Sequence, residues 1–254
     1  PALDQPRVMT ESQGLGEFRE LATGYHSGAE ARLNTEIAWR PNAGEVLPAA
    51  SYAQEFDLAV TQTGRIMVTV GADRYEAFSW FGAGDGEWRT IGQEPGGGWD
   101  SLSVEGNTAS CANDTLSLER KALRRESHVE VRDTVRNLTG GDLALPFLNA
   151  VEVGSVEGLR EFRISGQLQR HFWANTKPYE GRQLAATPVV YVERDESAIG
   201  LVLEDDAYRN QGSVLCRDSA VWLGDDMFYL QPGGEDTFVW KIFPLAQPGY
   251  YALT

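Results

Sequence analysis

The sequence predicts an all-β protein, built as one large antiparallel β-sandwich. Segments in which apolar and polar residues alternate recur about every 8–12 residues with turn-forming residues between them, which is typical of sandwiches and barrels. Seven Trp, nine Tyr and ten Phe suit strands better than helices. No amphipathic helix longer than about 10 residues is evident, because the neighbours of the one helix-like stretch, residues 118–126, alternate.

The first regular structure follows a mixed N-terminal stretch. Residues 1–50 contain turn-forming residues and one short candidate strand at 36–39, so we expect an irregular segment that packs on the sandwich. The whole chain, residues 1–254, is expected to form a single domain. Aromatic residues close to the C-terminal end suggest that the natural chain continues and that this sequence is part of a longer one.

Two segments near the start of the sandwich predict a hairpin. Residues 56–60 and 65–70 alternate around a turn, and residues 74–80 form a third candidate strand. Residues 82–98 are different, because they contain seven glycines and predict a long loop. A loop of this length in a compact domain is usually functional or mobile.

The middle of the chain carries the clearest strand pattern, after a shorter strand at 115–120. Residues 127–136 alternate, with an apolar row of valines on one face that is interrupted by Asp133. If buried, Asp133 needs a partner, because an unpaired charge is costly in an apolar interior. A turn at 137–142 leads into residues 143–153, which we expect to pair with 127–136 as a long antiparallel pair.

The last third repeats the strand-and-turn theme. The segments 189–192 and 199–203 flank a turn and predict a second hairpin. Further strands are predicted at residues 213–216, 220–223, 227–230 and 237–243.

The charge balance narrows the choice of partners. The net charge is −15, so the chain repels phosphate backbones and anionic membrane surfaces, and we expect neither nucleic acid nor membrane as a partner. No stretch approaches the roughly 18 apolar residues of a membrane span. Neutral and cationic partners remain open.

The two cysteines, Cys111 and Cys216, leave a disulfide open, although two buried thiols are the favoured interpretation. A pair of cysteines does not define the compartment, and an extracellular or periplasmic location is favoured. The three histidines, His26, His128 and His171, share no ligand spacing, and no metal or cofactor motif occurs, so no cofactor is expected. Calcium is the one alternative, at the acidic pairs 205–206 and 225–226.

Candidate sugar-binding residues lie in three segments. Pyranose rings pack on aromatic faces while polar side chains bind their hydroxyl groups, so segments that mix the two types are candidates. The candidate residues are Arg170, His171, Trp173, Asn175, Lys177 and Tyr179 in one segment, Trp88 and Trp99 (with Trp80) around the glycine-rich loop, and Tyr208 and Arg209 in the third.

Several runs carry a family resemblance: residues 97–102, 118–120, 129–139, 200–209 and 230–234 followed by 239–244. Over residues 55–250 the chain resembles the large "supersandwich" β-domains of carbohydrate-active proteins, similar in fold to galactose mutarotase. The resemblance implies a scaffold or glycan-binding domain that often precedes the catalytic domain of a glycoside hydrolase or polysaccharide lyase. Mutarotases use histidines and a carboxylate, but the corresponding segment here, residues 145–152, has no histidine.

The sequence therefore favours an accessory β-sandwich domain that binds an oligosaccharide or polysaccharide, or supports a covalently linked catalytic domain. One alternative is a carbohydrate enzyme in its own right, either an aldose epimerase or a hydrolase or lyase, with His171 and Glu180 or Asp206 as the reacting pair. The other is a non-enzymatic structural or interaction domain. Whether the chain alone is an enzyme stays open.

Overall fold

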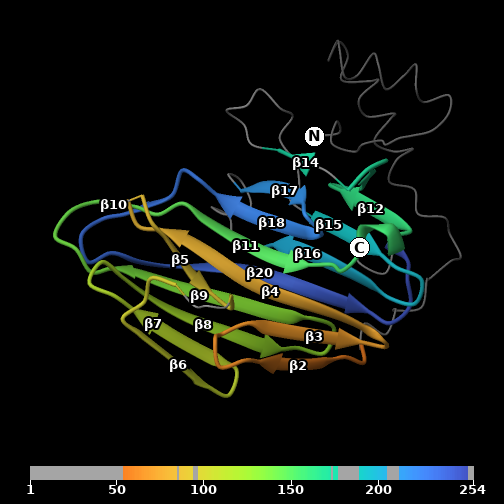
Figure 1. Ribbon diagram of the computed structural model, residues 1–254, viewed down its shortest axis with the longest axis horizontal. Coiled ribbons are helices and arrows are strands. Elements are labelled where there is room, and N and C mark those ends of the chain that lie inside the picture. The colour runs from red at the N-terminus through yellow and green to blue at the C-terminus, as the bar shows by residue number, and fades with distance from the viewer. Residues whose placement is uncertain are drawn as a thin grey trace, which may run out of the picture. The chain divides into compact units, whose positions relative to one another are not determined.

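The described part of the chain folds almost entirely into antiparallel strands (Figure 1). The computed structural model describes residues 54–84, 86–93, 97–172, 174–176, 189–204 and 212–250. The expected N-terminal segment, residues 1–50 with its candidate strand at 36–39, lies outside these residues, and its packing on the sandwich stays a prediction. Within the described chain, nothing helical has the length and apolar character of a membrane crossing.

Two large sheets and one short ribbon contain all the named strands. In order across the first sheet these are β14 (Ala174–Asn175), β17 (Ser213–Arg217), β18 (Ala220–Asp225), β11 (Phe147–Glu152), β4 (Asp73–Gly82), β3 (Ile66–Val70) and β2 (Asp57–Val60), with β5 (Trp88–Ile91) also paired to β4. Across the second sheet they are β13 (Gln167–Leu168), β12 (Glu161–Ile164), β15 (Val189–Glu193), β16 (Ala198–Leu203), β20 (Glu235–Leu245), β9 (Val129–Asn137), β8 (Leu116–Arg124), β7 (Thr108–Ala112) and β6 (Ser101–Glu105). The ribbon pairs β10 (Leu143–Ala144) with β19 (Tyr229–Leu230).

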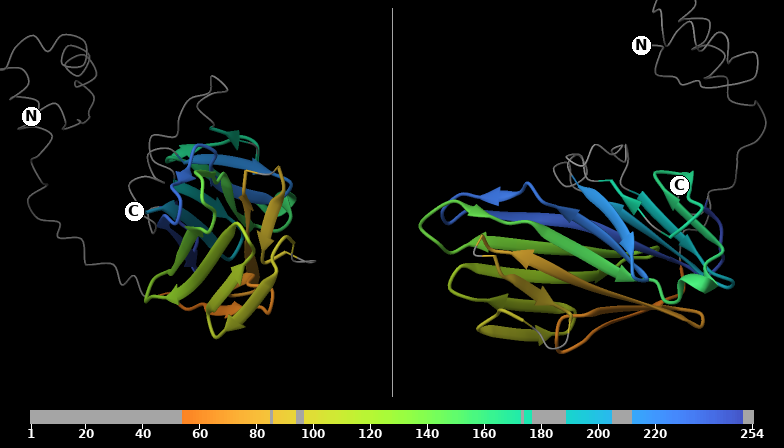
Figure 2. Two further views of the ribbon diagram at one scale, coloured as in Figure 1. Left: turned by 90° about the vertical axis from the view of Figure 1, so that its left-hand side faces the viewer. Right: turned by 45° about the horizontal axis from the view of Figure 1, so that its top comes forward.

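The two sheets form the layers of a sandwich (Figure 2). Alternate residues of each strand point inward, and the inward rows of both sheets make one continuous apolar core. Its members include Ile66, Val68, Tyr75, Phe81, Val151 and Leu223 from the first sheet and Leu118, Val131, Leu201, Trp240 and Ile242 from the second. The prediction of a large antiparallel β-sandwich is confirmed.

Both predicted hairpins are confirmed, since β2 pairs with β3 and β15 pairs with β16. Two other expectations are wrong. Residues 127–136 and 143–153 do not pair, because β9 lies between β8 and β20 in the second sheet while β11 lies between β4 and β18 in the first. The segment between them crosses from one layer to the other, and alternation alone does not specify which strand is the neighbour. The expected loop at 82–98 also contains a strand, β5.

Asp133 is fully buried, and the partner that its position required is Arg120, directly opposite on β8. Arg120 Nε lies 2.6 Å from Asp133 Oδ1 and Nη2 lies 2.8 Å from Oδ2. Trp240 Nε1 donates to the same carboxylate at 3.1 Å. Arg120 also donates to Ser79 on β4 and to Asn149 on β11, so this buried network links the two sheets.

Candidate functional site

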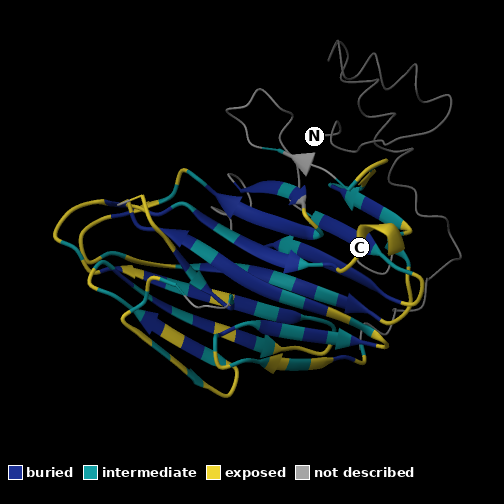
Figure 3. Cartoon of the chain, in the orientation of Figure 1, coloured by how far each residue is buried: buried dark blue, intermediate teal, exposed yellow. Residues whose placement is uncertain are grey.

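The outward faces of the two sheets differ in character. In the second sheet, β8 and β9 alternate between buried and more exposed residues, so the outward face there is polar and wet, whereas β15 and β16 are buried on both faces around a small cluster of Tyr191, Ala198 and Leu245. At the centre of the first sheet the strands are buried on both faces, and all six residues of β18 are buried (Figure 3). A separate apolar cluster therefore lies on the outward face of the first sheet. It consists of Phe78, Ala150, Ala220 and Trp222, with Trp80, Leu148 and Leu215 packed against it.

The aromatic members of this cluster, together with Trp88, form what we call the aromatic platform: Phe78, Trp80, Trp88 and Trp222. The Trp222 ring makes edge contacts with Phe78 and Trp80, at centroid distances of 5.3 and 5.1 Å. Trp88 lies 6.0 Å from Trp80 in a tilted arrangement. Three indoles from three strands (β4, β5 and β18) thus meet on one face.

Small residues between the rings make these contacts possible. Ala150 on β11 stands directly opposite both Phe78 on β4 and Trp222 on β18. Because Ala150 projects only a methyl group, the rings on either side meet across it. Gly224 has a similar role for Leu148, whose Cδ2 would lie only 2.3 Å from a Cβ at position 224.

The platform is partly accessible, and the indole N–H groups of its tryptophans differ in whether they have a hydrogen-bond acceptor. Trp88 is 41% exposed. Trp80 Nε1 donates to Gln93 Oε1 at 2.8 Å. Trp222 is 92% buried, and its Nε1 has no hydrogen-bond acceptor in the described chain. An unsatisfied buried donor costs about 1–3 kcal/mol.

One edge of the platform is charged. Arg65 lies 5.8 Å from the Phe78 ring centre and is bonded to Glu76 and to the carbonyl oxygen of Gly92. Arg74 forms a second ion pair with Glu76, at 2.7 Å. Both arginines are therefore already paired with a carboxylate of the protein.

Of the tryptophans predicted around residues 82–98, the structure brings Trp80 and Trp88 together but separates Trp99 from them. Trp99 packs against the sandwich core, and its Nε1 donates to the Thr90 carbonyl at 2.9 Å. Its role in the structure is to fix this segment against β5. Trp99 is thus not part of the platform.

Arg170 and His171 lie elsewhere, in a pocket of about 390 Å³ beside β12 and the short 3-10 helix η2 (Val156–Gly158). Both side chains are exposed, and the neighbouring Phe172 ring contacts Phe162 at 4.9 Å. The other predicted residues, Trp173, Lys177, Tyr179, Tyr208 and Arg209 and the side chain of Asn175, lie outside the described residues. The same is true of Glu180 and Asp206, so the proposed pairing of either with His171 stays a prediction.

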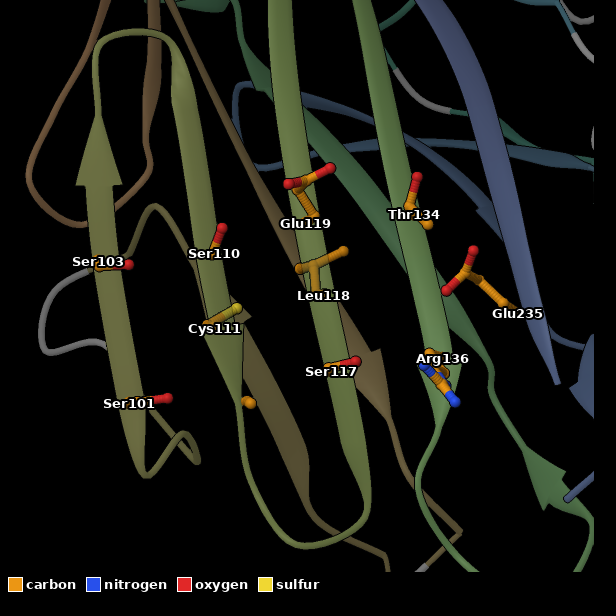
Figure 4. A pocket seen from close by; sticks show the side chains of 11 residues that line it. Ser101, Ser103, Ser110, Cys111, Ser117, Leu118, Glu119, Thr134, Arg136 and Glu235 are labelled. Atoms are coloured by element: carbon orange, nitrogen blue, oxygen red, sulfur yellow. The ribbon is translucent and has the colours of Figure 1, made fainter. Parts of the chain in front are cut away.

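A second hollow, of about 450 Å³, lies on the outward face of the second sheet (Figure 4). It crosses β6, β7, β8 and β9 and is lined mostly by hydroxyl-bearing and charged side chains: Ser101, Ser103, Ser110, Ser117, Glu119, Thr134, Arg136 and Glu235. No aromatic side chain lines it. It is a polar groove of the kind that water fills readily.

The remaining reactive side chains of the described chain have structural surroundings. His128 stacks on Phe243 at 4.8 Å, and burial followed by the nearby Lys241 lowers its pKa. Cys111 and Cys216 are free and buried, as the favoured interpretation predicted. Asp225, at one suggested calcium position, is buried and accepts a hydrogen bond from the Met227 backbone at 2.7 Å. Within the described ranges, no three His, Cys, Asp or Glu side chains gather closely enough to hold a metal ion.

Sequence reasoning missed Phe78 and Trp222 because it assigned strand aromatics to the core. The available signal was the local pattern. In β18, residues of both parities are apolar, and Trp222 alternates with Val221 and Leu223 rather than with polar residues. A strand without polar positions indicates burial on both faces.

No protein-family model matches this sequence, and no curated protein does. Among solved structures, the chain is similar to a polysaccharide lyase at 12% identity and a TM-score of 0.47, over 76% of this chain and 32% of that one. It is also similar to a galactose mutarotase related enzyme from Lactobacillus acidophilus, at 7% identity and a TM-score of 0.42, over 76% and 98% of the two chains. A putative aldose 1-epimerase from Escherichia coli K12 is 10% identical, with a TM-score of 0.34 over 77% and 81%. The chain spans about a third of the length of the lyase.

Proposed function

We propose that this domain binds carbohydrate on the aromatic platform and serves as an accessory β-sandwich domain of a carbohydrate-active protein. The observation that carries the proposal is the apolar, indole-rich cluster on the outward face of the first sheet. In a two-layer sandwich the outward faces normally meet water and are polar. The cluster itself is buried, and the exposed ring at its edge, Trp88, is the feature that supports a binding surface here.

The chemistry of the platform suits a sugar ring. The C–H face of a pyranose is apolar and packs on flat aromatic side chains, whereas its hydroxyl groups need donors and acceptors nearby. Trp88 offers the most accessible ring of the platform. Gln93, whose side-chain oxygen accepts from Trp80 Nε1, offers a polar group beside these rings.

The two hollows support carbohydrate binding less well than the platform does. The pocket with Arg170 and His171 has aromatic neighbours, but its Phe162 is buried, and its Arg160 is paired with Asp195. The groove on the second sheet has hydroxyl groups but no aromatic ring on which a sugar could stack. Among the described residues, only the platform brings several indoles together.

The test is isothermal titration of the chain against plant, algal and microbial polysaccharides, with Trp88→Ala and Trp80→Ala beside the unmodified protein. Loss of a central aromatic contact should weaken binding by at least about tenfold. Trp88→Ala is the milder variant because the side chain is exposed, and thermal denaturation shows whether each variant is folded. His171→Ala, in the pocket beside β12, is the control and should bind normally.

Two results would contradict the proposal. Binding that survives both tryptophan changes and disappears in His171→Ala would place the site in the pocket beside β12. Absence of binding to every polysaccharide would reject carbohydrate recognition and favour a scaffold role, in which the platform contacts another domain.

A further inference from the structure

The outward face of the first sheet continues beyond the aromatic platform toward one end of the sandwich. Trp88 stands directly opposite Gly82 on β4. The Gly82 backbone N–H donates to the Pro146 carbonyl oxygen at 2.7 Å, and a Cβ at position 82 would lie 2.8 Å from Pro146 Cγ. The Pro146 ring therefore covers Gly82, and an apolar surface leads from Trp88 across β4 to the chain that joins β10 and β11.

The β10–β19 ribbon extends this surface. Over residues 143–148, buried residues alternate with more exposed ones, so Ala144 lies on the same outward side as Pro146. Tyr229 is directly opposite Ala144, and opposite residues of an antiparallel pair share a face. The ribbon lies next to the turn after β4, because a Cβ at Gly84 would lie 3.8 Å from the Ala144 carbonyl oxygen (Figure 1).

A β-bulge brings Met227 to the same surface. The chain from β18 to β19 has one residue more than the chain opposite it, so both Asp226 and Met227 stand against Pro146. Such a bulge changes the direction in which a side chain points. The Asp225 carboxylate accepts a hydrogen bond from the Met227 backbone N–H at 2.7 Å and so holds the bulge in place.

This end of the face is exposed, in contrast to the centre of the platform. Trp88 is 41% exposed, Met227 65% and Tyr229 61%, whereas Phe78 and Trp222 are buried. Three strand spacings, roughly 14 Å, separate the strand of Trp88 from that of Tyr229. Two accessible aromatic rings thus lie at either end of a floor of small and apolar residues. We call this surface the exposed strip: Trp88, Gly82, Pro146, Ala144, Met227 and Tyr229.

The strip favours a neutral and extended carbohydrate chain. Its neighbours along the sequence include the carboxylates of Glu87, before Trp88, and Asp226, before Met227. Together with the net charge of −15 they disfavour uronic acids and other anions. One sugar ring is too small to reach both aromatic side chains, whereas an extended chain can place the C–H face of a different ring on each. Pyranoses joined by β-1,4 linkages form extended chains of this kind.

We propose that the exposed strip binds several consecutive rings of a neutral β-1,4-linked glycan, with Trp88 and Tyr229 as two separate stacking positions. This inference rests on the proposed function and specifies the ligand class and the length of the site. It also adds Tyr229 and Met227 to the binding surface. Because one chain connects the two stacking positions, contact at the first makes contact at the second easier, and affinity rises with chain length.

The experiment is isothermal titration with β-1,4-linked oligosaccharides of glucose, mannose and xylose, each from the disaccharide to the hexasaccharide. At least one series should bind. Within that series, the hexasaccharide should bind at least about tenfold more tightly than the disaccharide.

Three variants test the second stacking position. Tyr229→Ala should weaken hexasaccharide binding by about tenfold and leave the disaccharide within about twofold of its original affinity. Tyr229→Phe keeps the ring and should keep most of the affinity. Leu168→Ala removes an exposed apolar side chain from β13 in the second sheet, is the control and should bind as the unmodified protein does. Thermal denaturation shows whether each variant is folded.

The outcomes separate this inference from the proposed function. Equal affinity for the disaccharide and the hexasaccharide, lost in Trp88→Ala, would overturn the extended strip and keep the carbohydrate site. So would binding of another polysaccharide, lost in Trp88→Ala, when none of the three neutral series binds. Tighter binding of a galacturonic acid hexasaccharide than of every neutral one would reject the ligand class. Self-association of the chain that disappears in Tyr229→Ala would show that the strip joins two copies, and would reject the inference.

Discussion

Removing one member of the buried Arg120–Asp133 pair is expected to destabilise the sandwich strongly. Neither side chain is exposed to solvent. In Arg120→Met, the Asp133 carboxylate keeps only the Trp240 Nε1 donor of its described side-chain partners. Breaking a buried ion pair by deleting one partner costs about 3–5 kcal/mol, because the remaining charge stays in an apolar interior. For a domain of this size, that loss corresponds to a fall in Tm of roughly 6–20 °C.

The double variant Arg120→Met/Asp133→Leu should lose less free energy of unfolding than the sum of the losses in the two single variants. With both charges gone, Ser79 and Asn149 still bond to each other. The main remaining defect is the orphaned Trp240 Nε1, which costs about 1–3 kcal/mol. The coupling between the two positions is therefore expected to be several kcal/mol.

The measurement is urea denaturation followed by circular dichroism and tryptophan fluorescence. Arg132→Met is the matched control, because Arg132 is on the same strand as Asp133, points outward and pairs only with the partly exposed Glu130. Its loss should cost less than about 1 kcal/mol. The reasoning would be refuted by a single Arg120 or Asp133 variant that loses under about 1 kcal/mol, or by a double variant whose loss equals the sum.

Two further predictions concern small buried groups. In Gly224→Ala, the new methyl group would lie 2.6 Å from the backbone oxygen of Phe147, so the free energy of unfolding measured in urea should fall by about 1–3 kcal/mol. The control is Gly140→Ala, where no atom lies within 4 Å of a new Cβ and the loss should be much smaller. Equal losses in the two variants would contradict the steric argument. Burial raises the pKa of the Cys111 thiol to about 12 and also raises the pKa of Cys216. A disulfide-exchange reagent should therefore label neither thiol in the folded protein and both thiols in urea. Fast labelling of the folded protein would contradict this prediction.

Strand periodicity accounts for most of what could be predicted here. In β9 the alternation of valines with polar residues assigned each side chain to a face correctly, and it singled out Asp133 as a residue that needs a partner. The same rule overlooked β6 and β7, whose short polar side chains resemble those of a loop. It also paired residues 127–136 with the wrong strand, because a turn specifies that the chain changes direction but not whether it stays in the same sheet.

The sequence by itself determined the all-β class, the strand positions along much of the chain, the two hairpins and the identity of the buried acid. These features depend on neighbours close in the chain, where a period of two residues and turn-forming residues carry the information. Only the tertiary structure decided that Arg120 pairs with Asp133, that Trp99 packs against the core, and that Trp80, Trp88 and Trp222 meet on one outward face. Those contacts join strands up to 142 positions apart (Trp80 and Trp222), and cross-strand register, which no local pattern specifies, brings them together.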